Sequence, residues 1–492
     1  MHFTDPPDSS APGDVKSTPM HGPWWKELTG YHWFVLTVAA LGWLFDTMDQ
    51  QLFTLARMPA MREVLASAPD VAPAEELVNT YVGHATAVFL MGWATGGVFF
   101  GILGDRIGRA RTMLLTILLY SFCTGLSALS WNFTSFAAFR FLTGLGVGGE
   151  FAVGVALVAE VMPDRARPHA LGWLQSLSAV GNVSAALIAF WLSTAGGTSI
   201  VANVSHLLFG SEATPPSPWR VMFVIGTLPA LLALLIMGRL KEPERWRSVA
   251  VSDEVHQQLG SLRELFGTPR WRHNAFVGLA LAFAGVVGLW GIGFFNVELI
   301  RKALEKGFAE QLQGEELKSK VNAWVSIASL VQNIGAFFGI QAFMRLTNRT
   351  SRRFAFAVSF TAAAFATALN FLLVGRIAGA YDILWLTPLM GACQLAIFGG
   401  YAIYFPELFP TRLRSTGTSF CYNIGRFVAA VGPSMLGYLT GSVFAHTADP
   451  FTGGADPATP YRLAGVTMCS VFLLGLLALP FAPETKDQPL PE

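Results

Sequence analysis

The sequence predicts an all-α membrane protein in which twelve transmembrane helices form two pseudo-symmetric six-helix bundles. The first observation is compositional: 52% of the 492 residues are hydrophobic and only 13% are charged, about half the charged fraction of an average soluble protein. The second is a series of twelve long apolar segments, and the third is a set of loop motifs that recurs in both halves of the chain. The 33 Lys and Arg balance 32 Asp and Glu, which excludes a basic nucleic-acid-binding protein.

Each of the twelve segments is long enough to cross a bilayer as a helix, which takes about 20 mostly apolar residues. The segments are continuously apolar, unlike the short alternating strands of a membrane β-barrel. The 49 glycines fit this class because membrane helices use small residues for close packing. The predicted spans are 33–57, 80–103, 112–130, 133–158, 169–194, 220–239, 272–300, 321–345, 354–375, 382–404, 415–440 and 462–482.

Polar segments divide the chain into five parts. The first is polar and rich in Pro, without the charged start and short apolar stretch of a cleavable signal peptide. A longer polar and partly amphipathic segment separates six spans from six. The predicted parts are a cytoplasmic N-terminal tail (1–30), an N-terminal six-helix bundle (31–239), a cytoplasmic linker with amphipathic helices (240–271), a C-terminal six-helix bundle (272–482) and a cytoplasmic C-terminal tail (483–492).

Lys and Arg are distributed unequally between the two sets of loops. The loops on the same side as the termini carry about twice as many as the other set, and cytoplasmic loops of membrane proteins are enriched in these residues. We therefore expect a multi-pass protein of the inner (plasma) membrane with both termini in the cytoplasm.

Two pairs of loop motifs indicate an internal repeat. The loop after the fourth span, EVMPDRAR, places Glu160 seven residues before Arg167, and the loop after the tenth span, ELFPTRLR, places Glu407 seven residues before Arg414. A looser pair is formed by GDRIGRAR after the second span and TNRTSRR after the eighth. The repeat predicts two homologous six-helix bundles.

These motifs resemble those of the major facilitator superfamily. The segment GILGDRIGRAR at 101–111 matches the signature between the second and third helices of that family, and RFLTGLGVGGE at 140–150 resembles its helix-4 motif. The segments EVMPDRAR, PELFPTRLR and the terminal PETK at 483–486 are similar to the sugar-porter and organic-ion branches. The resemblance covers nearly the whole chain. It implies two bundles that rock around a central cavity and open it alternately to each side of the membrane.

The resemblance also implies a gate at the cytoplasmic ends of the helices. In the family, the loop carboxylate that corresponds to Asp105 caps a neighbouring helix, where the helix dipole favours negative charge, and pairs with Arg. The alternative is that these charges are surface residues that only set the topology. In the second copy Asn348 and Ser351 replace the expected Asp and Gly, which predicts a weaker half of the gate. The expected gate residues are Asp105, Arg106, Arg109, Glu160, Arg167, Arg349, Arg352, Glu407 and Arg414.

Five charged residues fall inside the predicted spans: Asp46, Asp49, Arg140, Glu150 and Arg426. Charges at membrane depth are costly and usually functional. Because three acids and two bases leave one carboxylate without a partner, we expect Asp46, Asp49 or Glu150 to carry a transported proton. The alternative for Asp49 and Arg140 is a buried ion pair that holds the first and fourth helices together.

Arg426 lies in the opposite half of the chain from all three acids. A guanidinium that faces a cavity binds carboxylates through paired, charge-assisted hydrogen bonds. The alternative is a bridge between the bundles to Asp46 or Glu150, and a substrate anion could displace such a bridge. If Arg426 binds the anion and a carboxylate of the other half binds the proton, transport is symport.

Two further patterns concern the substrate class. The three-residue spacing of Asp46 and Asp49 partly resembles the helix-1 pattern D-G-x-D of the aromatic acid/proton symporters and related metabolite/proton symporters, with Thr47 and Met48 in the middle. The seventh span reads GLWGIGFFNVELI at 288–300 and lacks the QQxSGxN-like stretch of sugar porters, which disfavours a hexose carrier.

Other polar or aromatic residues inside the spans are candidates for contact with a substrate. Each alone is more often part of an interhelical hydrogen bond or of the core. Gln332 and Asn333 are adjacent, so they point about 100° apart on the helix and cannot both face the cavity. Besides Arg426, the expected substrate-binding residues are Tyr422, Asn423, Gln394, Tyr401, Trp290, Gln332, Asn333, Asn182 and Gln175.

The sequence therefore predicts a secondary active transporter and not an enzyme, since it contains no catalytic triad and no metal-ligand cluster. We expect proton-coupled import of a small organic anion, a monocarboxylate or aromatic acid, by alternating access and without a cofactor or metal. The expected partners are the small-molecule substrate, protons and the lipid bilayer, with no nucleic acid, and the expected oligomeric state is a monomer. The alternatives are a sugar or other neutral-solute carrier, a drug/proton antiporter, and a solute sensor that does not transport.

Overall fold

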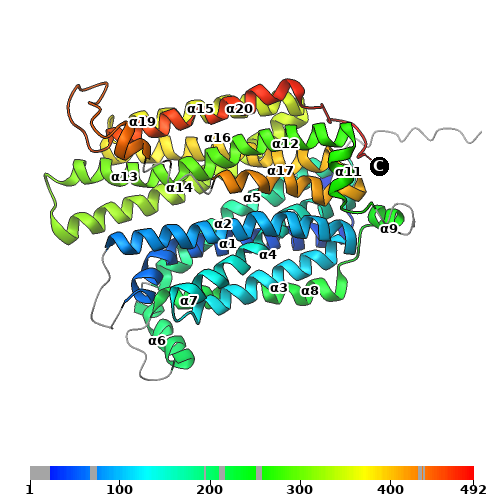
Figure 1. Cartoon of the computed structure of the whole chain (residues 1–492), viewed down its shortest axis with the longest axis horizontal. Coiled ribbons are helices and arrows are strands. Elements are labelled where there is room, and N and C mark those ends of the chain that lie inside the picture. Colours follow the sequence, from blue (N-terminus) through cyan, green and yellow to red (C-terminus); the bar gives the residue numbers. More distant parts are fainter. Residues whose placement is uncertain are drawn as a thin grey trace, which may run out of the picture.

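The computed structural model describes residues 23–66, 75–192, 195–209, 217–250, 258–429, 435 and 438–491. Over these residues the chain folds into helices joined by turns and loops, as predicted (Figure 1). The stretches of the predicted parts that lie outside the described residues are 1–22 of the N-terminal tail, 67–74, 193–194 and 210–216 of the N-terminal bundle, 251–257 of the linker, 430–434 and 436–437 in the eleventh span, and residue 492.

The N-terminal half forms one bundle, preceded by the short helix η1 (Trp24–Glu27). Two of its helices, the first and the fourth, start at a side-chain cap; the side chain of Asn132, for example, accepts a hydrogen bond of 2.8 Å from the backbone N–H of Ser135 at the start of the fourth helix. The sixth predicted span is divided into two helices, and a further helix that the sequence did not predict precedes it. The elements are α1 (Gly30–Val64), α2 (Glu75–Ile107), α3 (Arg109–Ala128), α4 (Phe133–Val161), α5 (Arg167–Leu192), α6 (Ala195–Phe209), α7 (Pro218–Ile225) and α8 (Ala230–Arg239).

The C-terminal half forms the second bundle. Its first span is interrupted by a π-helical turn, η2, which adds a residue to one turn and which the sequence did not predict. The elements are α12 (Pro269–Val286), η2 (Val287–Gly291), α13 (Ile292–Phe308), α14 (Gly314–Arg349), α15 (Arg352–Leu373), η3 (Gly379–Asp382), α16 (Ile383–Glu407), η4 (Thr411–Leu413), α17 (Arg414–Ala429), η5 (Leu439–Val443), α19 (Thr459–Met468), α20 (Val471–Ala478) and η6 (Leu479–Phe481).

Nine helices in the described part of the chain are long and apolar enough to cross a membrane, and they coincide with nine of the predicted spans. The remaining three differ for visible reasons. The first span, α1, has 35 residues but carries Asp46 and Asp49, the sixth is divided between α7 and α8, and the eleventh is only partly described.

Several helices extend beyond their predicted spans, most clearly around the segment between the seventh and eighth spans. The segment 301–320 was expected to be a loop, but α13 continues to Phe308 and α14 begins at Gly314. These extensions are polar, and the side chains of Arg301 and Asn322 are joined by a hydrogen bond of 2.8 Å. A hydropathy pattern marks only the apolar part of a helix, so it ends before the helix does.

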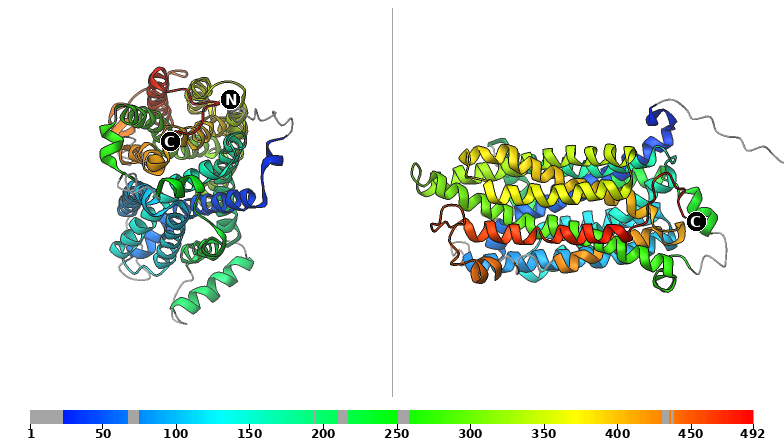
Figure 2. Two further views of the ribbon diagram at one scale, coloured as in Figure 1. Left: turned by 90° about the vertical axis from the view of Figure 1, so that its right-hand side faces the viewer. Right: turned by 90° about the horizontal axis from the view of Figure 1, so that it is seen from above.

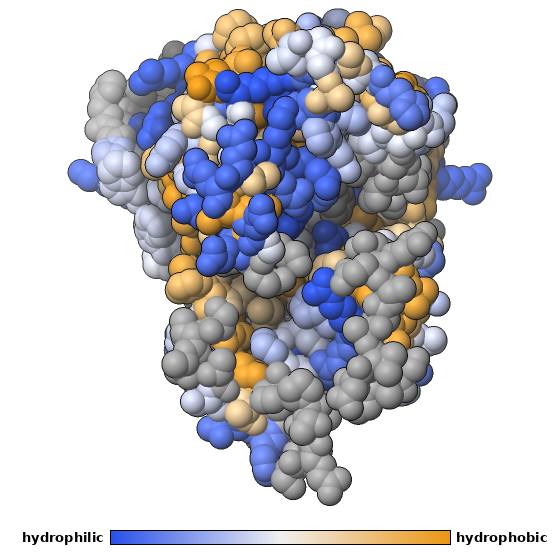
Figure 3. Space-filling model, turned by 90° about the vertical axis from the view of Figure 1, so that its left-hand side faces the viewer, coloured by the Kyte–Doolittle hydropathy of each residue, from blue (hydrophilic) through white to orange (hydrophobic). Residues whose placement is uncertain are grey.

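The two bundles lie side by side with their helices roughly parallel to one long axis (Figures 1 and 2). One end of the molecule, here called the linker end, carries α9 (Glu244–Ala250), α11 (Leu262–Gly267) and the C-terminus. The other end, here called the far end, carries α6 and the segment before α19. At the far end the surface is hollowed between the bundles (Figure 3).

The internal repeat is visible in the packing of the two bundles. In each half, two glycines of one helix lie against the backbone of a second helix so closely that a Cβ atom would collide with it. Such small residues allow membrane helices to approach closely. The contacts are Gly92 on Phe141, Gly96 on Leu145, Gly335 on Pro388 and Gly339 on Ala392.

Candidate functional site

The middle of the N-terminal bundle holds the three predicted carboxylates, all fully buried or nearly so. In α1, Asp46 accepts a hydrogen bond of 3.2 Å from Gln50, and its second oxygen has no partner. One turn further, Asp49 accepts a hydrogen bond of 2.8 Å from the hydroxyl of Thr124 in α3. The structure therefore brings the two carboxylates of α1 together inside the bundle, as their spacing predicts.

Arg140 in α4 reaches the second oxygen of Asp49. The distance from Nη1 is 3.8 Å, which is within ion-pair range but too long for a hydrogen bond. The guanidinium instead donates to Ser127 at 2.7 and 3.0 Å and to Thr143 at 3.1 Å, and lies 4.5 Å from the centre of the Phe223 ring. The predicted pair is thus present as an electrostatic contact; hydroxyl groups bind Nε and Nη2 of the arginine, and Nη1 has no hydrogen-bond partner.

Only one of the two carboxylate oxygens of Glu150 in α4 accepts a hydrogen bond. The hydroxyl of Thr116 donates to one carboxylate oxygen at 2.7 Å, while the other oxygen has no hydrogen-bond partner and faces Gly42 of α1. A Cβ atom on Gly42 would collide with that oxygen, so a larger residue there would force the Glu150 carboxylate to move. Asp46 lies within electrostatic reach of Glu150, Asp49 and Arg426.

Arg426 in α17 is almost fully buried at the boundary between the bundles. Its guanidinium lies between two aromatic rings, 4.1 Å from the centre of the Trp93 ring of α2 and 4.2 Å from that of Tyr422. It donates to the Tyr422 carbonyl at 2.6 Å and to the Asn423 side chain at 3.0 Å, and its Nε has no partner. Among the described residues, no ion pair joins Arg426 to a carboxylate, so the alternative of a bridge between the bundles is not formed here.

Aromatic rings from both bundles surround Arg426. Tyr422 stacks on Phe151 of α4 with ring centres 4.0 Å apart, and Trp290 meets Trp93 edge to face at 5.6 Å. Sequence reasoning named Tyr422 and Trp290 but missed Trp93 and Phe151. Nothing in the pattern distinguishes these two from core aromatics, because every span is rich in such residues.

The remaining predicted substrate residues separate into two groups. Asn182 of α5 donates to Asn333 of α14 at 2.9 Å across the bundle boundary, and the side-chain oxygen of the buried Gln175 has no partner. Gln332 is half-buried. Two residues make contacts inside the C-terminal bundle instead, where Gln394 donates to Thr367 at 3.0 Å and Tyr401 to the Leu281 carbonyl at 2.5 Å.

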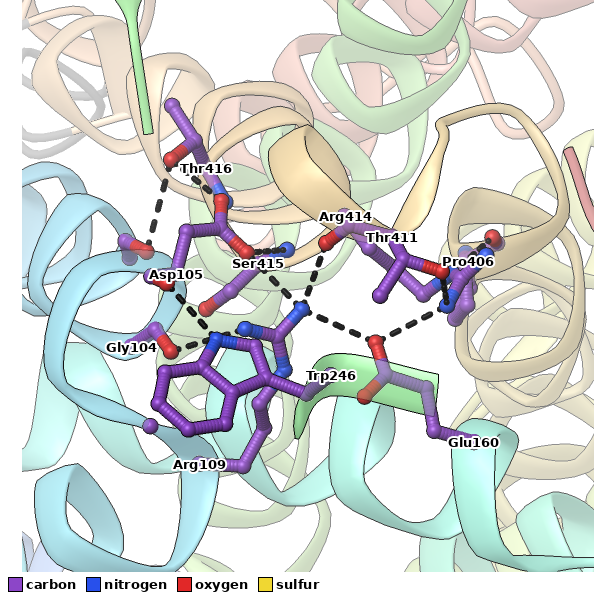
Figure 4. A network of polar contacts seen from close by, with 12 residues as sticks. Gly104, Asp105, Arg109, Glu160, Trp246, Pro406, Thr411, Arg414, Ser415 and Thr416 are labelled. Carbon is purple, nitrogen blue, oxygen red and sulfur yellow. Dashed lines mark hydrogen bonds and ion pairs between the residues drawn. The ribbon is translucent and has the colours of Figure 1, made fainter. Parts of the chain in front are cut away.

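A second buried polar network closes the linker end (Figure 4). The carboxylate of Asp105, at the end of α2, accepts hydrogen bonds from the backbone N–H groups of Ser415 at 3.1 Å and Thr416 at 2.8 Å, and from the Thr416 hydroxyl at 2.6 Å. A carboxylate of one bundle thereby caps the N-terminus of α17 in the other, where the helix dipole favours negative charge.

Glu160 is the second connection between the bundles at this end. One of its oxygens accepts from Arg109 of its own bundle at 2.9 Å and from Arg414 of the other at 2.8 Å. Arg109 also donates to the Thr411 carbonyl at 2.6 Å and lies 3.0 Å from Asp105. These charged side chains are fully buried, and each has at least one partner of opposite charge.

The second copy of the motif stays inside its own bundle. Arg352 makes a two-pronged pair with Glu407 at 2.9 and 3.1 Å, and Glu407 also accepts from Thr485 at 2.5 Å. Across the boundary, Asn348 contacts His169 of α5 at 3.1 Å. This is the copy for which the sequence predicts the weaker half of the gate, and the neutral Asn348 stands where the first copy has an acid.

Three other predicted gate arginines make no hydrogen bond or ion pair between the bundles in the described part of the chain, although Arg167 lies within electrostatic reach of Glu407 in the other bundle. Arg167 donates to the Ala159 carbonyl at 2.9 Å and pairs with Asp164. Arg106 donates to the Leu259 carbonyl of the linker at 3.4 Å. Arg349 is exposed, and none of the hydrogen bonds or ion pairs described for this part of the chain involves it.

Two helix caps at the linker end were missed by the sequence reasoning. Glu242 accepts from the backbone N–H groups of Ala110 at 3.2 Å and Arg111 at 3.1 Å, and Glu484 accepts from those of Arg352 at 3.0 Å and Arg353 at 3.2 Å. Burial acts to raise the pKa of Glu484, but these and neighbouring N–H groups hold it below its usual value. Both acids follow the last span of their half, which was the signal available.

Comparison with known proteins identifies relatives. Residues 39–433 match the Major Facilitator Superfamily. The chain is 28% identical over 367 residues to the cis,cis-muconate transport protein of Acinetobacter baylyi, which covers 74% of this chain and 79% of the relative. It is 25% identical over 439 residues to the niacin transporter NiaP of the same organism, and this match covers 83% of this chain and 87% of the relative.

Solved structures share the architecture. The proton:xylose symporter XylE bound to 6-bromo-6-deoxy-D-glucose superposes with a TM-score of 0.65 at 17% identity, over 94% of this chain and 98% of that one. The human organic anion transporter MFSD10 superposes with a TM-score of 0.56 at 16% identity, over 91% of this chain and 99% of that one. At these identities the likeness concerns the fold alone, and it agrees with the predicted twelve-helix architecture.

Proposed function

Because the chain belongs to the Major Facilitator Superfamily, and its relatives are membrane transporters and not enzymes, we propose that it imports a small organic anion together with a proton. Arg426 is the anion receptor in this proposal, and Asp46, Asp49 and Glu150 are the proton sites. Alternating exposure of the central site by the two bundles moves both across the membrane.

The observation that carries the proposal is the environment of Arg426. A buried guanidinium with no carboxylate partner among the described residues, enclosed by Trp93 and Tyr422, offers a positive charge between flat apolar faces. That combination suits a carboxylate attached to a planar, unsaturated group. The names of three relatives, transporters of cis,cis-muconate, niacin and 4-methylmuconolactone, support this substrate class.

Proton coupling is supported by the carboxylates of the N-terminal bundle. Asp46 and Glu150 are buried without an ion-pair partner among the described residues, and each has an oxygen that forms no hydrogen bond. A buried carboxylate without a positive partner binds a proton readily because burial disfavours the charged form. The solved neighbour XylE is described as a proton symporter, which supports the same coupling.

The proposal places the protein in the inner (plasma) membrane as a monomer, with the linker end and both termini in the cytoplasm. The loop charges favour this orientation. The buried network of Asp105, Arg109, Glu160 and Arg414 is then the cytoplasmic gate. With that gate closed, the recess at the far end is the route by which substrate enters (Figure 3).

The test is uptake by purified protein in liposomes, using benzoate, nicotinate and cis,cis-muconate beside a sugar and an amine, with and without an inward proton gradient. We expect the gradient to drive accumulation of at least one acid. If no acid accumulates in response to the gradient, the symport proposal is wrong; sugar uptake would favour the neutral-solute alternative. Saturable binding without any exchange would favour the sensor.

Carboxylate variants assign the proton site. We expect Asp46→Asn or Glu150→Gln to abolish gradient-driven accumulation while exchange of internal for external acid continues, because exchange needs no net proton movement. Glu305→Gln, which changes a carboxylate of α13 paired with Lys302 outside the charged cluster, is the control and should behave as wild type. Wild-type accumulation by both cluster variants would contradict the assignment.

A further inference from the structure

The helix α3 presents a row of hydroxyl groups to the charged residues of α1 and α4. The Thr116 hydroxyl donates to Glu150 at 2.7 Å, the Thr124 hydroxyl donates to Asp49 at 2.8 Å, and the Ser127 hydroxyl accepts from Arg140 at 2.7 Å. Thr116, Thr124 and Ser127 are fully buried. Their spacing places them on one face of α3, over a rise of about 16 Å.

Tyr120 fills the gap in this row. It lies one turn after Thr116 and one turn before Thr124, and its side chain is fully buried. Its hydroxyl makes no well-aligned hydrogen bond in the described part of the chain; the adjacent Ser121 hydroxyl lies near it, and the carboxylates of Glu150, Asp46 and Asp49 lie within electrostatic reach. Buried polar groups in native proteins nearly always have a partner, so an exception at a functional site calls for a reason.

The carboxylates around Tyr120 also lack hydrogen-bond partners. Asp46, Asp49 and Glu150 each have one oxygen without a hydrogen-bond partner. The positive charges that face this group from the packed helices are Arg140, 3.8 Å from Asp49, and Arg426, which lies across the bundle boundary within reach of Asp46. No arginine is paired with Glu150 among the described residues, so a proton is the simplest neutralising partner for it.

A phenol hydroxyl is suited to connect such groups, since it donates one hydrogen bond and accepts others at the same oxygen. The other members of the row cannot bridge the two acids, because Thr116 and Thr124 are separated by about 12 Å along the helix. In the described contacts α3 packs on α2, α4, α7 and α8 of its own bundle. A path along α3 therefore lies away from the boundary between the bundles, where Arg426 is found.

We propose that Tyr120 is a relay residue that passes the transported proton between the Asp46–Asp49 pair and Glu150, inside the N-terminal bundle and apart from the substrate. The inference rests on the proposed proton coupling. In the step, the proton of a protonated α1 carboxyl moves to the Tyr120 oxygen while the proton of that hydroxyl moves to the Glu150 carboxylate. One O–H bond breaks and one forms at Tyr120, so the phenol is regenerated, and the net change is one proton moved from Asp to Glu.

The test compares Tyr120→Phe with wild type and with Tyr81→Phe. The change at Tyr120 keeps the ring and removes the hydroxyl. Tyr81, in α2 of the same bundle, packs edge to face on Phe133 at 4.6 Å and is a matched control outside the carboxylate cluster. Each protein is placed in liposomes, and both exchange and gradient-driven accumulation of the acid that wild type accumulates are measured, with proton influx recorded by an internal pH dye.

We expect Tyr120→Phe to slow gradient-driven accumulation and proton influx by about a hundredfold, the range typical of a lost proton-transfer group, while exchange and the KM for the acid stay within about twofold of wild type. Tyr81→Phe should match wild type in all assays. Wild-type proton influx in Tyr120→Phe would overturn the relay. Equal loss of exchange and accumulation would also overturn it, since that pattern indicates a structural role. If wild type itself shows exchange but no proton influx, the proposed symport fails first and the relay with it.

Discussion

Arg426 is the residue whose environment departs most from a protein core. An uncompensated buried charge costs several kcal/mol, and here two backbone or side-chain oxygens and two aromatic rings offset only part of that cost. A bound carboxylate would supply the missing counter-charge. In the proposed function, the same residue would account both for affinity for an anion and for the exclusion of neutral solutes.

Replacing Arg426 tests this account. We expect Arg426→Ala to raise the KM for the transported acid by about 10- to 100-fold, the loss of a charge-assisted hydrogen bond worth roughly 1.5–3 kcal/mol, with Arg426→Lys in between. Arg301→Ala, at an exposed hydrogen bond to Asn322, is the control. An unchanged KM in Arg426→Ala would favour a neutral-solute carrier.

At this scale the sequence identified the charged residues of the site but not their surroundings. Asp46, Asp49, Arg140, Glu150 and Arg426 stand out because a charge in an apolar span is rare. A tryptophan, phenylalanine or threonine in a span is ordinary, so its role depends on which helices pack together. That information lies in tertiary contacts and is absent from any local pattern.

The helix ends at the linker end show what an element contributes. The carboxylates of Asp105, Glu242 and Glu484 each cap the start of a helix that is distant from them in the chain. Glu160 joins the two bundles through Arg414, whereas its repeat equivalent Glu407 pairs within its own bundle. The two glutamates are thus chemically matched. Removing the charge of Glu160 would break a contact between the bundles, whereas removing that of Glu407 would break a contact within one bundle.

This difference gives a sharp comparison. We expect Glu160→Gln to shift the protein towards a state open at the linker end, because Arg109 and Arg414 lose their shared counter-charge, while Glu407→Gln leaves that equilibrium unchanged and lowers only thermal stability. Distances between spin labels at the exposed positions 111 and 353 measure the opening. Equal distance distributions in both variants would contradict the gating role of Glu160.

The elements themselves were largely predictable, and the exceptions have physical causes. Apolar length located the spans, but it could not show the π-turn at Val287–Gly291 or the interruption between α7 and α8. Both are changes of hydrogen-bond register that leave the hydropathy nearly constant. The helix α6 was missed because it has only 15 residues, too few for a span, and mixes polar residues with apolar ones.

At the scale of the whole molecule, two pairs of helices make the most extensive described contacts between the bundles. Along α2 and α17, Gly97, Gly101 and Gly104 lie directly against side chains of α17. Along α5 and α14, the contacts are the amide and hydroxyl pairs of Asn182 with Asn333 and of Ser176 with Gln341. Alternating access requires at least the first of these boundaries to separate.

Locking that boundary should stop transport. An ideal Cβ on Gly104 lies 3.4 Å from the Ser415 Cβ, close to the spacing of a disulfide. In a background without the four native cysteines, oxidised Gly104→Cys/Ser415→Cys protein should keep binding acid from the far end but lose uptake, with recovery after reduction. The single variants are controls. Undiminished uptake by the oxidised pair would exclude opening at this boundary.

The unequal repeat has a mechanical consequence. One boundary is fastened at the linker end by carboxylates and arginines, and the other by the neutral contact of Asn348 with His169. Water and dissolved ions stabilise separated charges far more than separated amides. The free energy of separating the two bundles therefore differs between the two boundaries. The bundles would then rotate about an axis nearer α5 and α14, and the charged network on the opposite side would be the part that separates. Ionic strength would change the free energy of opening that charged network and would leave the α5–α14 boundary unaffected.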